Sequence, residues 1–155
     1  MTVTKLFVNN KIVDVTGTGY AIEGSFSHNP EDFMTLLEIG LLCNNSHLEN
    51  ETIIGDPTEG ALIVSALKGG VDHQDLLKTH QWNGENPFDS ERKMMSALYM
   101  RDDQQLIFTK GAIENLLPKC NQILINGKVE QLDQKGKEKI LHIAGEFSEQ
   151  ALRVL

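Results

Sequence analysis

Two-residue turn signals between short apolar runs restrict the fold of this chain more than any other feature. Asn9-Asn10 lies within residues 3–15, Asp102-Asp103 separates two runs of β-type composition, and Asn126-Gly127 separates a third pair. Asn, Asp and Gly tolerate the left-handed backbone of tight turns between antiparallel strands. The sequence therefore predicts antiparallel hairpins at these places, most strongly at Asn126-Gly127.

Helix signals lie between the predicted hairpins. Asp56 is suited to cap a helix that begins at Pro57 and ends at Gly69-Gly70. Pro30 opens another helix near residues 31–43. Its predicted core stripe consists of Phe33, Leu36, Leu37, Gly40 and Leu41. Further helices are expected over residues 72–79, 113–117 and about 134–150, and strands over 94–100, 105–109, 123–125 and 128–130. We therefore expect one α+β domain over residues 1–155, in which helices pack on an antiparallel, twisted sheet.

Composition excludes several classes of protein. The 155 residues are 40% hydrophobic and 23% charged, which is typical of a globular chain and argues against long disorder. The 14 Lys and Arg residues are outnumbered by 22 Asp and Glu, so sequence-independent binding to nucleic acid is disfavoured. No apolar run reaches the roughly 20 residues of a membrane helix. Because the chain stops within the apolar run 151–155, we expect it to be a piece of a larger protein.

Cysteine and histidine give no metal or disulfide pattern. Cys43 and Cys120 are too few for a disulfide framework and too far apart in sequence for a pair of metal ligands. The five histidines lack the spacing of a zinc-binding helix. We therefore expect no bound structural metal.

The first segment whose residues could bind a ligand or act chemically runs from Gly55 to Leu62. Asp56 is the predicted helix cap, and Glu59 follows it at the third helical position. On its spacing alone, Glu59 is best interpreted as the second half of a capping box. A functional role for this carboxylate is the alternative.

The second segment runs from Pro87 to Ser96. Phe88 precedes Lys93 by five residues, with Arg92 beside the lysine. An exposed Phe ring could stack on a base while Lys93 meets phosphate. Without context, a core position for Phe88 and a solvated edge for Arg92-Lys93 are the more common arrangement.

The third segment runs from Phe108 to Glu114. Lys110 ends a predicted strand, and Gly111 lets another group approach the backbone closely. This arrangement could place an ammonium group at the bottom of a cleft. A lysine at an ordinary strand end is the alternative.

Taken in this order, the three segments resemble the nucleotide-binding domain of P-type cation-transporting ATPases. Cys43-Asn44-Asn45-Ser46 is similar to a Cys-Asn signature of that family, and Met1-Thr2-Val3 resembles the residues beyond its phosphorylation motif. Leu152 to Leu155 resembles the strand that returns toward the phosphorylation domain. The Asp-Pro-Thr-Glu-Gly-Ala-Leu run and the Cys-Asn signature resemble the calcium-pump and sodium-pump branches of the family. The loop 15–20 also resembles bacterial and secretory-pathway calcium pumps.

The resemblance implies a role for each matching residue. Phe88 would stack on adenine, Glu59 would accept a hydrogen bond from the adenine amino group, and Lys93 and Arg153 would face phosphates. Further contacts would come from Lys110, Gly111 and Ala112 at the inner end of the pocket, with Thr58 and Leu155 as secondary contacts and Asp56, Arg92 and Ser90 in support. Ser90 stands where animal reticulum calcium pumps have an Arg, so one cationic phosphate contact is either missing or taken over by Arg92. Ile113 stands where the family usually has a Pro.

The same resemblance implies a function. The chain would be the ATP-binding cytoplasmic domain of an integral membrane pump, and it would present the γ-phosphate to an aspartate of a separate phosphorylation domain. That aspartate and the magnesium ligands are absent here, so we expect this piece to bind ATP without turnover, with Mg²⁺ held mainly by the phosphorylation domain. Its expected partners are ATP and the phosphorylation and actuator domains of the same chain, with no nucleic acid, no direct membrane contact and a monomeric state.

Three alternatives remain open at the level of sequence. The pump could carry sodium, magnesium or manganese in place of calcium. The chain could be a protein-interaction module without enzymatic function. A self-contained kinase or phosphatase would need its own phosphate loop or nucleophile, and no Gly-x-x-x-x-Gly-Lys-Ser/Thr run is present.

Overall fold

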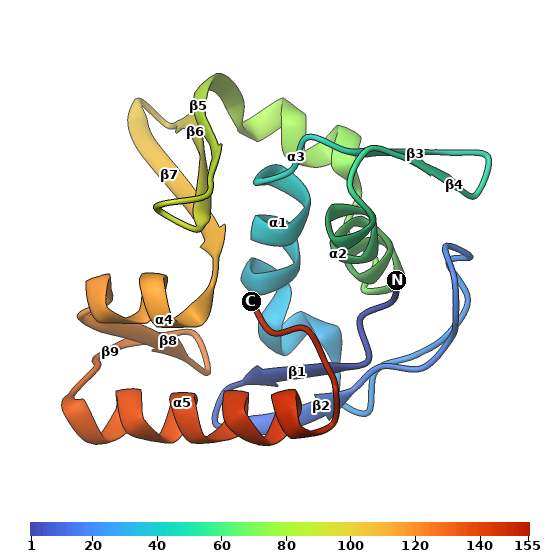
Figure 1. Ribbon diagram of the computed structural model, residues 1–155. Helices are drawn as coiled ribbons and strands as arrows, with labels where there is room; N and C mark the ends of the chain where they lie inside the picture. The colour runs from blue at the N-terminus through green and yellow to red at the C-terminus, as the bar shows by residue number, and fades with distance from the viewer.

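The strands of this protein pair only in the antiparallel sense and divide among four sheets. The computed structural model describes residues 1–155 (Figure 1). The largest sheet has the strand order β5 (Gln81–Asp89), β6 (Met94–Arg101) and β7 (Gln104–Gly111). The other sheets are the hairpins β1 (Lys5–Val8) with β2 (Lys11–Asp14), β3 (His47–Glu49) with β4 (Thr52–Ile54), and β8 (Gln122–Ile125) with β9 (Lys128–Gln131). Helices accompany these sheets, so the predicted α+β class is confirmed.

The predicted turn residues adopt the backbone that two-residue hairpin loops require. The φ angles are 52° and 59° at Asn9-Asn10, 48° and 60° at Asp102-Asp103, and 48° and 75° at Asn126-Gly127. Positive φ at both central residues matches the right-handed twist of the flanking strands. These three hairpins are therefore confirmed where the sequence placed them.

Two strand regions escaped the sequence prediction. The β3-β4 hairpin turns at Asn50-Glu51, with φ of 46° and 59°. Glu is not a typical turn residue, so this dipeptide gives little signal. Strand β5 contains Gly84 and Pro87, and its register with β6 shifts twice. Gly and Pro interrupt the pattern by which a strand is recognised.

Five α-helices complete the fold, and most lie close to their predicted bounds. They are α1 (Met34–Leu42), α2 (Pro57–Lys68), α3 (His73–Thr79), α4 (Ile113–Leu116) and α5 (Gln134–Glu149). Helix α1 is preceded by a 3₁₀ turn at Pro30–Phe33, and α4 continues into a 3₁₀ turn at Leu117–Lys119 that contains Pro118. None of these helices combines the length and the apolar character that crossing a membrane requires.

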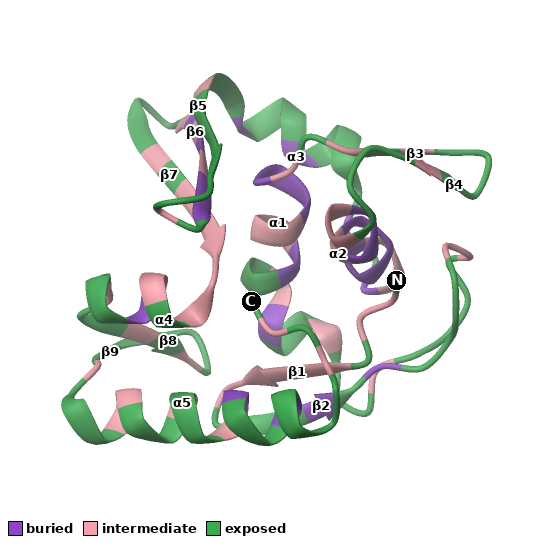
Figure 2. Ribbon diagram, in the orientation of Figure 1, coloured by how far each residue is buried: buried purple, intermediate pink, exposed green.

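The core lies between α1, α2 and the inner face of β6. Buried residues, drawn in purple in Figure 2, concentrate on these three elements. Their main contributors are Leu37, Leu41 and Leu42 of α1, Ile63 and Ala66 of α2, and Met95, Ala97 and Tyr99 of β6. Tyr99 also donates a hydrogen bond of 3.0 Å to the carbonyl of Leu42. This contact ties the end of α1 to the sheet.

One residue of the predicted core stripe lies elsewhere. Leu36 is 41% exposed, whereas Leu37 and Leu41 are 4% and 5% exposed. Successive residues of an α-helix are rotated by about 100°, so Leu36 faces a different flank of α1 from its neighbour Leu37. The placement of Leu36 in the core was therefore wrong.

Candidate functional site

A nearly buried ion pair joins two of the three segments that the sequence singled out. The Lys110 Nζ atom at the end of β7 lies 2.7 Å from Glu59 Oε1 in the first turn of α2. Their side chains are only 17% and 14% exposed. Lys110 Nζ also donates a hydrogen bond to the carbonyl of Cys43. The ammonium group is therefore fixed between α2 and the end of α1.

The start of α2 differs from the capping box that spacing favours. Asp56 Oδ1 accepts hydrogen bonds from the N–H groups of Thr58 at 2.7 Å and Glu59 at 3.2 Å, as predicted for a cap. The N–H of Asp56, however, donates to Ser46 Oγ at 2.9 Å and not to Glu59. The interpretation of Glu59 as the second half of a capping box was therefore wrong, because the Ser46 hydroxyl, and not the Glu59 carboxylate, accepts from the N–H of Asp56.

The pKa of Asp56 is below its ordinary value. Partial burial opposes ionisation, but hydrogen bonds from the N–H groups of Glu59 and Thr58 and the positive charge of Arg153 outweigh it. The carboxylate is thus stabilised by the helix start and by the chain's last residues together.

The loop 43–46 supports Glu59 from the other side. Ser46 Oγ donates to Glu59 Oε2 at 2.8 Å, and the N–H of Asn45 donates to the same oxygen at 3.2 Å. Asn44 Nδ2 donates to the carbonyls of Gly40 and Glu59, both at 3.0 Å. These supporting residues belong to the Cys-Asn signature, but spacing could not assign them a role, because the contacts bridge separate elements.

The same loop reaches the largest sheet. Asn45 Nδ2 donates to Glu85 Oε1 of β5 at 3.3 Å, and the Cys43 thiol donates to the carbonyl of Met95 at 3.6 Å. Burial raises the pKa of Cys43, and the nearby charge of Lys110 only partly opposes this effect. Residues 43–46 therefore connect α2 with β5 and β6.

Phe88 lies on the surface of the molecule. Its side chain is at the end of β5 and is 64% exposed, so a core position for Phe88 is excluded. Asp89 orders the turn that follows by accepting from the N–H groups of Glu91 at 3.0 Å and Arg92 at 2.7 Å. Ser90 is exposed within this turn. The ring is thus available to stack on a planar ligand.

Lys93 is joined to the Lys110 segment through the backbone. It is exposed, with φ of 54°, and its carbonyl accepts from the N–H of Ala112 at 2.9 Å. Gly111 permits this approach, since a Cβ atom there would lie 2.4 Å from the Lys93 carbonyl oxygen. The group that approaches Gly111 closely is therefore the chain's own backbone. Arg92 is less free than Lys93, because its guanidinium donates to the carbonyl of Met94 at 2.9 Å.

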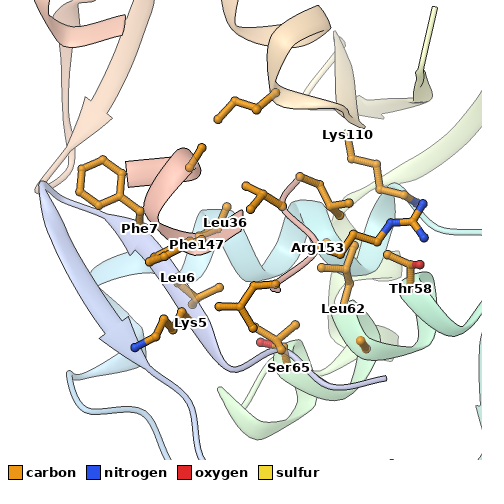
Figure 3. Close-up of a pocket in the computed structure, with 18 of the residues that line it drawn as sticks. Lys5, Leu6, Phe7, Leu36, Thr58, Leu62, Ser65, Lys110, Phe147 and Arg153 are labelled. Carbon is orange, nitrogen blue, oxygen red and sulfur yellow. The ribbon is translucent and has the colours of Figure 1, made fainter. Parts of the chain in front are cut away.

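A hollow of about 420 Å³ lies beside the ion pair, and its lining is mostly apolar. The predicted residues among those that line it are Thr58, Lys110, Gly111, Arg153 and Leu155. Figure 3 shows the Arg153 guanidinium close to the ends of Lys110 and Thr58, while Leu36 and Phe147 lie farther along the hollow. Phe88, Lys93 and Glu59 are outside this lining. The structure thus brings Arg153, Lys110 and Thr58 to one place and leaves Phe88 on a neighbouring strand end.

Comparison with known proteins identifies the family. Residues 32–155 match the family described as P-type ATPase, cytoplasmic domain N. The chain belongs to this family and is an N domain like those of calcium pumps.

Several calcium-transporting ATPases are similar to the chain. A calcium-transporting ATPase 1 of Bacillus cereus is 47% identical over 77% of the chain and 14% of its own length. A calcium-transporting ATPase of Bacillus subtilis is 33% identical over 100% of the chain and 19% of its own length. The human calcium-transporting ATPase type 2C member 1 is 33% identical over 100% of the chain and 18% of its own length. The chain therefore spans less than a fifth of these relatives.

Proposed function

We propose that residues 1–155 are the nucleotide-binding domain of a larger membrane pump and bind ATP on its cytoplasmic side. The observation that carries this proposal is the convergence of Glu59 and Lys110, from distant parts of the sequence, into one nearly buried pair beside Arg153. A carboxylate paired with one cation and close to another suits a ligand that has an amino-bearing base and a polyanionic tail. Membership of the N-domain family supports the same function.

The base is recognised by Glu59 and Phe88. A carboxylate has about four acceptor positions, and Lys110, Ser46 and Asn45 use three of those on Glu59. One position is left for the exocyclic amine of adenine. Stacking on the exposed ring of Phe88 supplies about 1–3 kcal/mol. Guanine presents a carbonyl where adenine presents the amine, and the carboxylate therefore disfavours it.

Lys93 and Arg153 contact the phosphates, and Arg92 is a supporting cation. In a chain of net charge −8, a few exposed cations steer an anionic ligand to one face. The domain presents the γ-phosphate to an aspartate of a separate phosphorylation domain, so its contribution to phosphoryl transfer is positioning. No group of three or more His, Cys, Asp or Glu side chains is placed to share a metal ion, and magnesium is assigned no ligand in this chain.

Calcium is the proposed cargo of the intact pump. Relatives from bacteria and from animals are named as calcium-transporting ATPases, which supports calcium over sodium, magnesium or manganese. The intact pump is proposed to be an enzyme that hydrolyses ATP and translocates an ion. The isolated chain is proposed to be a monomer that binds ATP without turnover.

The proposal is tested by titrating ATP into the isotope-labelled chain and following its amide chemical shifts. We expect the largest shifts near Glu59, Phe88 and Lys110, weaker shifts with GTP, and no phosphate release in a parallel hydrolysis assay. Shifts confined to other surfaces would reject the site. Hydrolysis by the purified chain would favour a self-contained enzyme.

A further inference from the structure

The hydroxyl group of Ser46 stands between the two groups that a capping box would join. It accepts from the N–H of Asp56 at 2.9 Å and donates to Glu59 Oε2 at 2.8 Å. Ser46 lies in the short connection between α1 and β3, away from α2 in the sequence (Figure 1). One side chain from outside the helix therefore binds both the cap backbone and the carboxylate.

Without Ser46, Glu59 would have a different partner. In a capping box the carboxylate at the third helical position accepts from the N–H of the cap residue. Glu59 holds that position relative to Asp56, but the N–H of Asp56 is already bound to Ser46. The Glu59 carboxylate points instead to Lys110, with 2.7 Å between Oε1 and Nζ.

The backbone before the helix is shaped for this contact. Gly55 has a φ of 127°, and a Cβ atom there would lie 2.2 Å from Ser46 Oγ. Only glycine therefore permits the approach of Ser46 to the helix start without displacement. The contact of Ser46 with the helix start therefore depends also on Gly55, the residue before the cap. This dependence supports a specific arrangement of the two segments.

We propose that Ser46 is a positioning residue: it takes the place of Glu59 at the helix cap and so keeps the Glu59 carboxylate in the nucleotide site. This inference rests on the proposed function and extends it to base selectivity. The carboxylate stays beside Lys110 with one acceptor position free, and that position distinguishes an amino-bearing purine from guanine.

Removal of the hydroxyl group releases Glu59. In Ser46→Ala the N–H of Asp56 loses its acceptor, and the Glu59 carboxylate is the nearest group by sequence position that can replace it. The Glu59 carboxylate then accepts from the N–H of Asp56 and no longer accepts from the exocyclic amine of the purine. We expect the ratio of GTP to ATP dissociation constants to fall roughly tenfold, because a hydrogen bond to a charged acceptor is lost for adenine only.

The test compares both dissociation constants for the parent, Ser46→Ala, Ser46→Thr and a control, Asp72→Ala. Asp72 caps α3 in the same manner, accepting from the N–H groups of Gln74 at 2.8 Å and Asp75 at 3.2 Å. We expect Ser46→Thr, which keeps the hydroxyl, and Asp72→Ala to retain the parent ratio. An unchanged ratio in Ser46→Ala, or an equal fall in Asp72→Ala, would overturn the positioning role.

A second measurement requires no nucleotide. Unfolding free energies of the parent, Ser46→Ala, Glu59→Ala and the double variant, measured in urea, form a cycle around the hydrogen bond between Ser46 and Glu59. We expect their effects on the free energy of unfolding to be non-additive, and additive effects would overturn the contact.

The two proposals fail in different ways. A parent that binds neither nucleotide would overturn the proposed function and the selectivity with it. ATP binding by the parent with an unchanged ratio in Ser46→Ala would overturn the positioning role alone.

Discussion

The two halves of the candidate site differ in how firmly the protein itself holds them. Glu59 and Lys110 are 14% and 17% exposed and bind each other, Ser46, and the backbone of residues 43 and 45. Phe88 is 64% exposed, and Lys93 extends from an exposed turn. One half is a closed polar network, and the other is an open surface at the end of β5.

This difference separates stability from binding. A nearly buried network contributes to the folded state even without ligand, and loss of one member leaves its partner unpaired in a poorly hydrated place. An exposed ring or ammonium group contributes little to stability and gains its interactions only when a ligand arrives. Substitutions in the two halves should therefore affect different measurements.

The largest expected effect is on the stability of the closed half. Lys110→Ala removes the only cation paired with Glu59 and leaves that carboxylate nearly buried. We expect a loss of about 2–3 kcal/mol in the free energy of unfolding, measured in urea, because removal of one partner from a buried pair commonly costs about 3–5 kcal/mol and this pair retains some solvent contact.

The matched control for Lys110→Ala is Lys78→Ala. Lys78 pairs with Asp75 on the surface, where their side chains are 73% and 67% exposed. We expect a change of about 0.5 kcal/mol or less, as is usual for exposed ion pairs. Equal losses in the two variants would contradict the distinction between a closed and an open half.

The second effect is on binding by the open half. Phe88→Ala should weaken ATP binding by about 1–3 kcal/mol through loss of stacking, while the unfolding free energy changes by about 0.5 kcal/mol or less. Isothermal titration and urea unfolding give the two values. Trp82→Ala is the control, because Trp82 is also an aromatic residue of β5 and is 59% exposed. The stacking role fails if both variants weaken ATP binding equally.

The contrast between the halves also explains what the sequence could predict. Local signals placed the hairpin turns, the cap at Asp56 and the start of α2, because turn and cap chemistry depends on neighbouring residues. The link from Ser46 to Glu59 escaped prediction, since it joins segments that only the fold brings together. Spacing even favoured the wrong partner for Glu59. The exposure of Phe88 likewise depends on an irregular strand that β-sheet patterns do not reveal.

A third prediction concerns the contribution of the Lys93 charge, in the open half, to ATP binding. Lys93→Ala should weaken ATP binding about threefold to fivefold at low salt, with a smaller effect at high salt, because an exposed charge is screened. Dissociation constants at two ionic strengths test this. Lys128→Ala on β9 removes an exposed lysine from another sheet and is the control. A loss that is the same at both salt concentrations would argue against a phosphate contact by Lys93.

The smallest expected effect concerns pH and the start of α2, where the closed half meets solvent. Because the pKa of Asp56 is lower in the folded chain than its ordinary value, the ionised carboxylate favours folding. This contribution is present above the unfolded pKa of about 3.9 and is lost as pH falls through the lower folded pKa. Asp56→Asn keeps a capping oxygen without the charge.

For Asp56→Asn we expect a loss of about 0.5 kcal/mol or less at pH 7, since solvent screens this exposed charge. The gap between the urea midpoints of the parent and Asp56→Asn should narrow as pH falls from about 4 through the lower folded pKa, because the parent carboxyl is then protonated as well. A gap that stays constant from pH 7 to pH 3 would show that the charge of Asp56 contributes nothing to the helix start. Asp56 would then act only as a hydrogen-bond acceptor, and the electrostatic link between α2 and Arg153 would have no energetic weight.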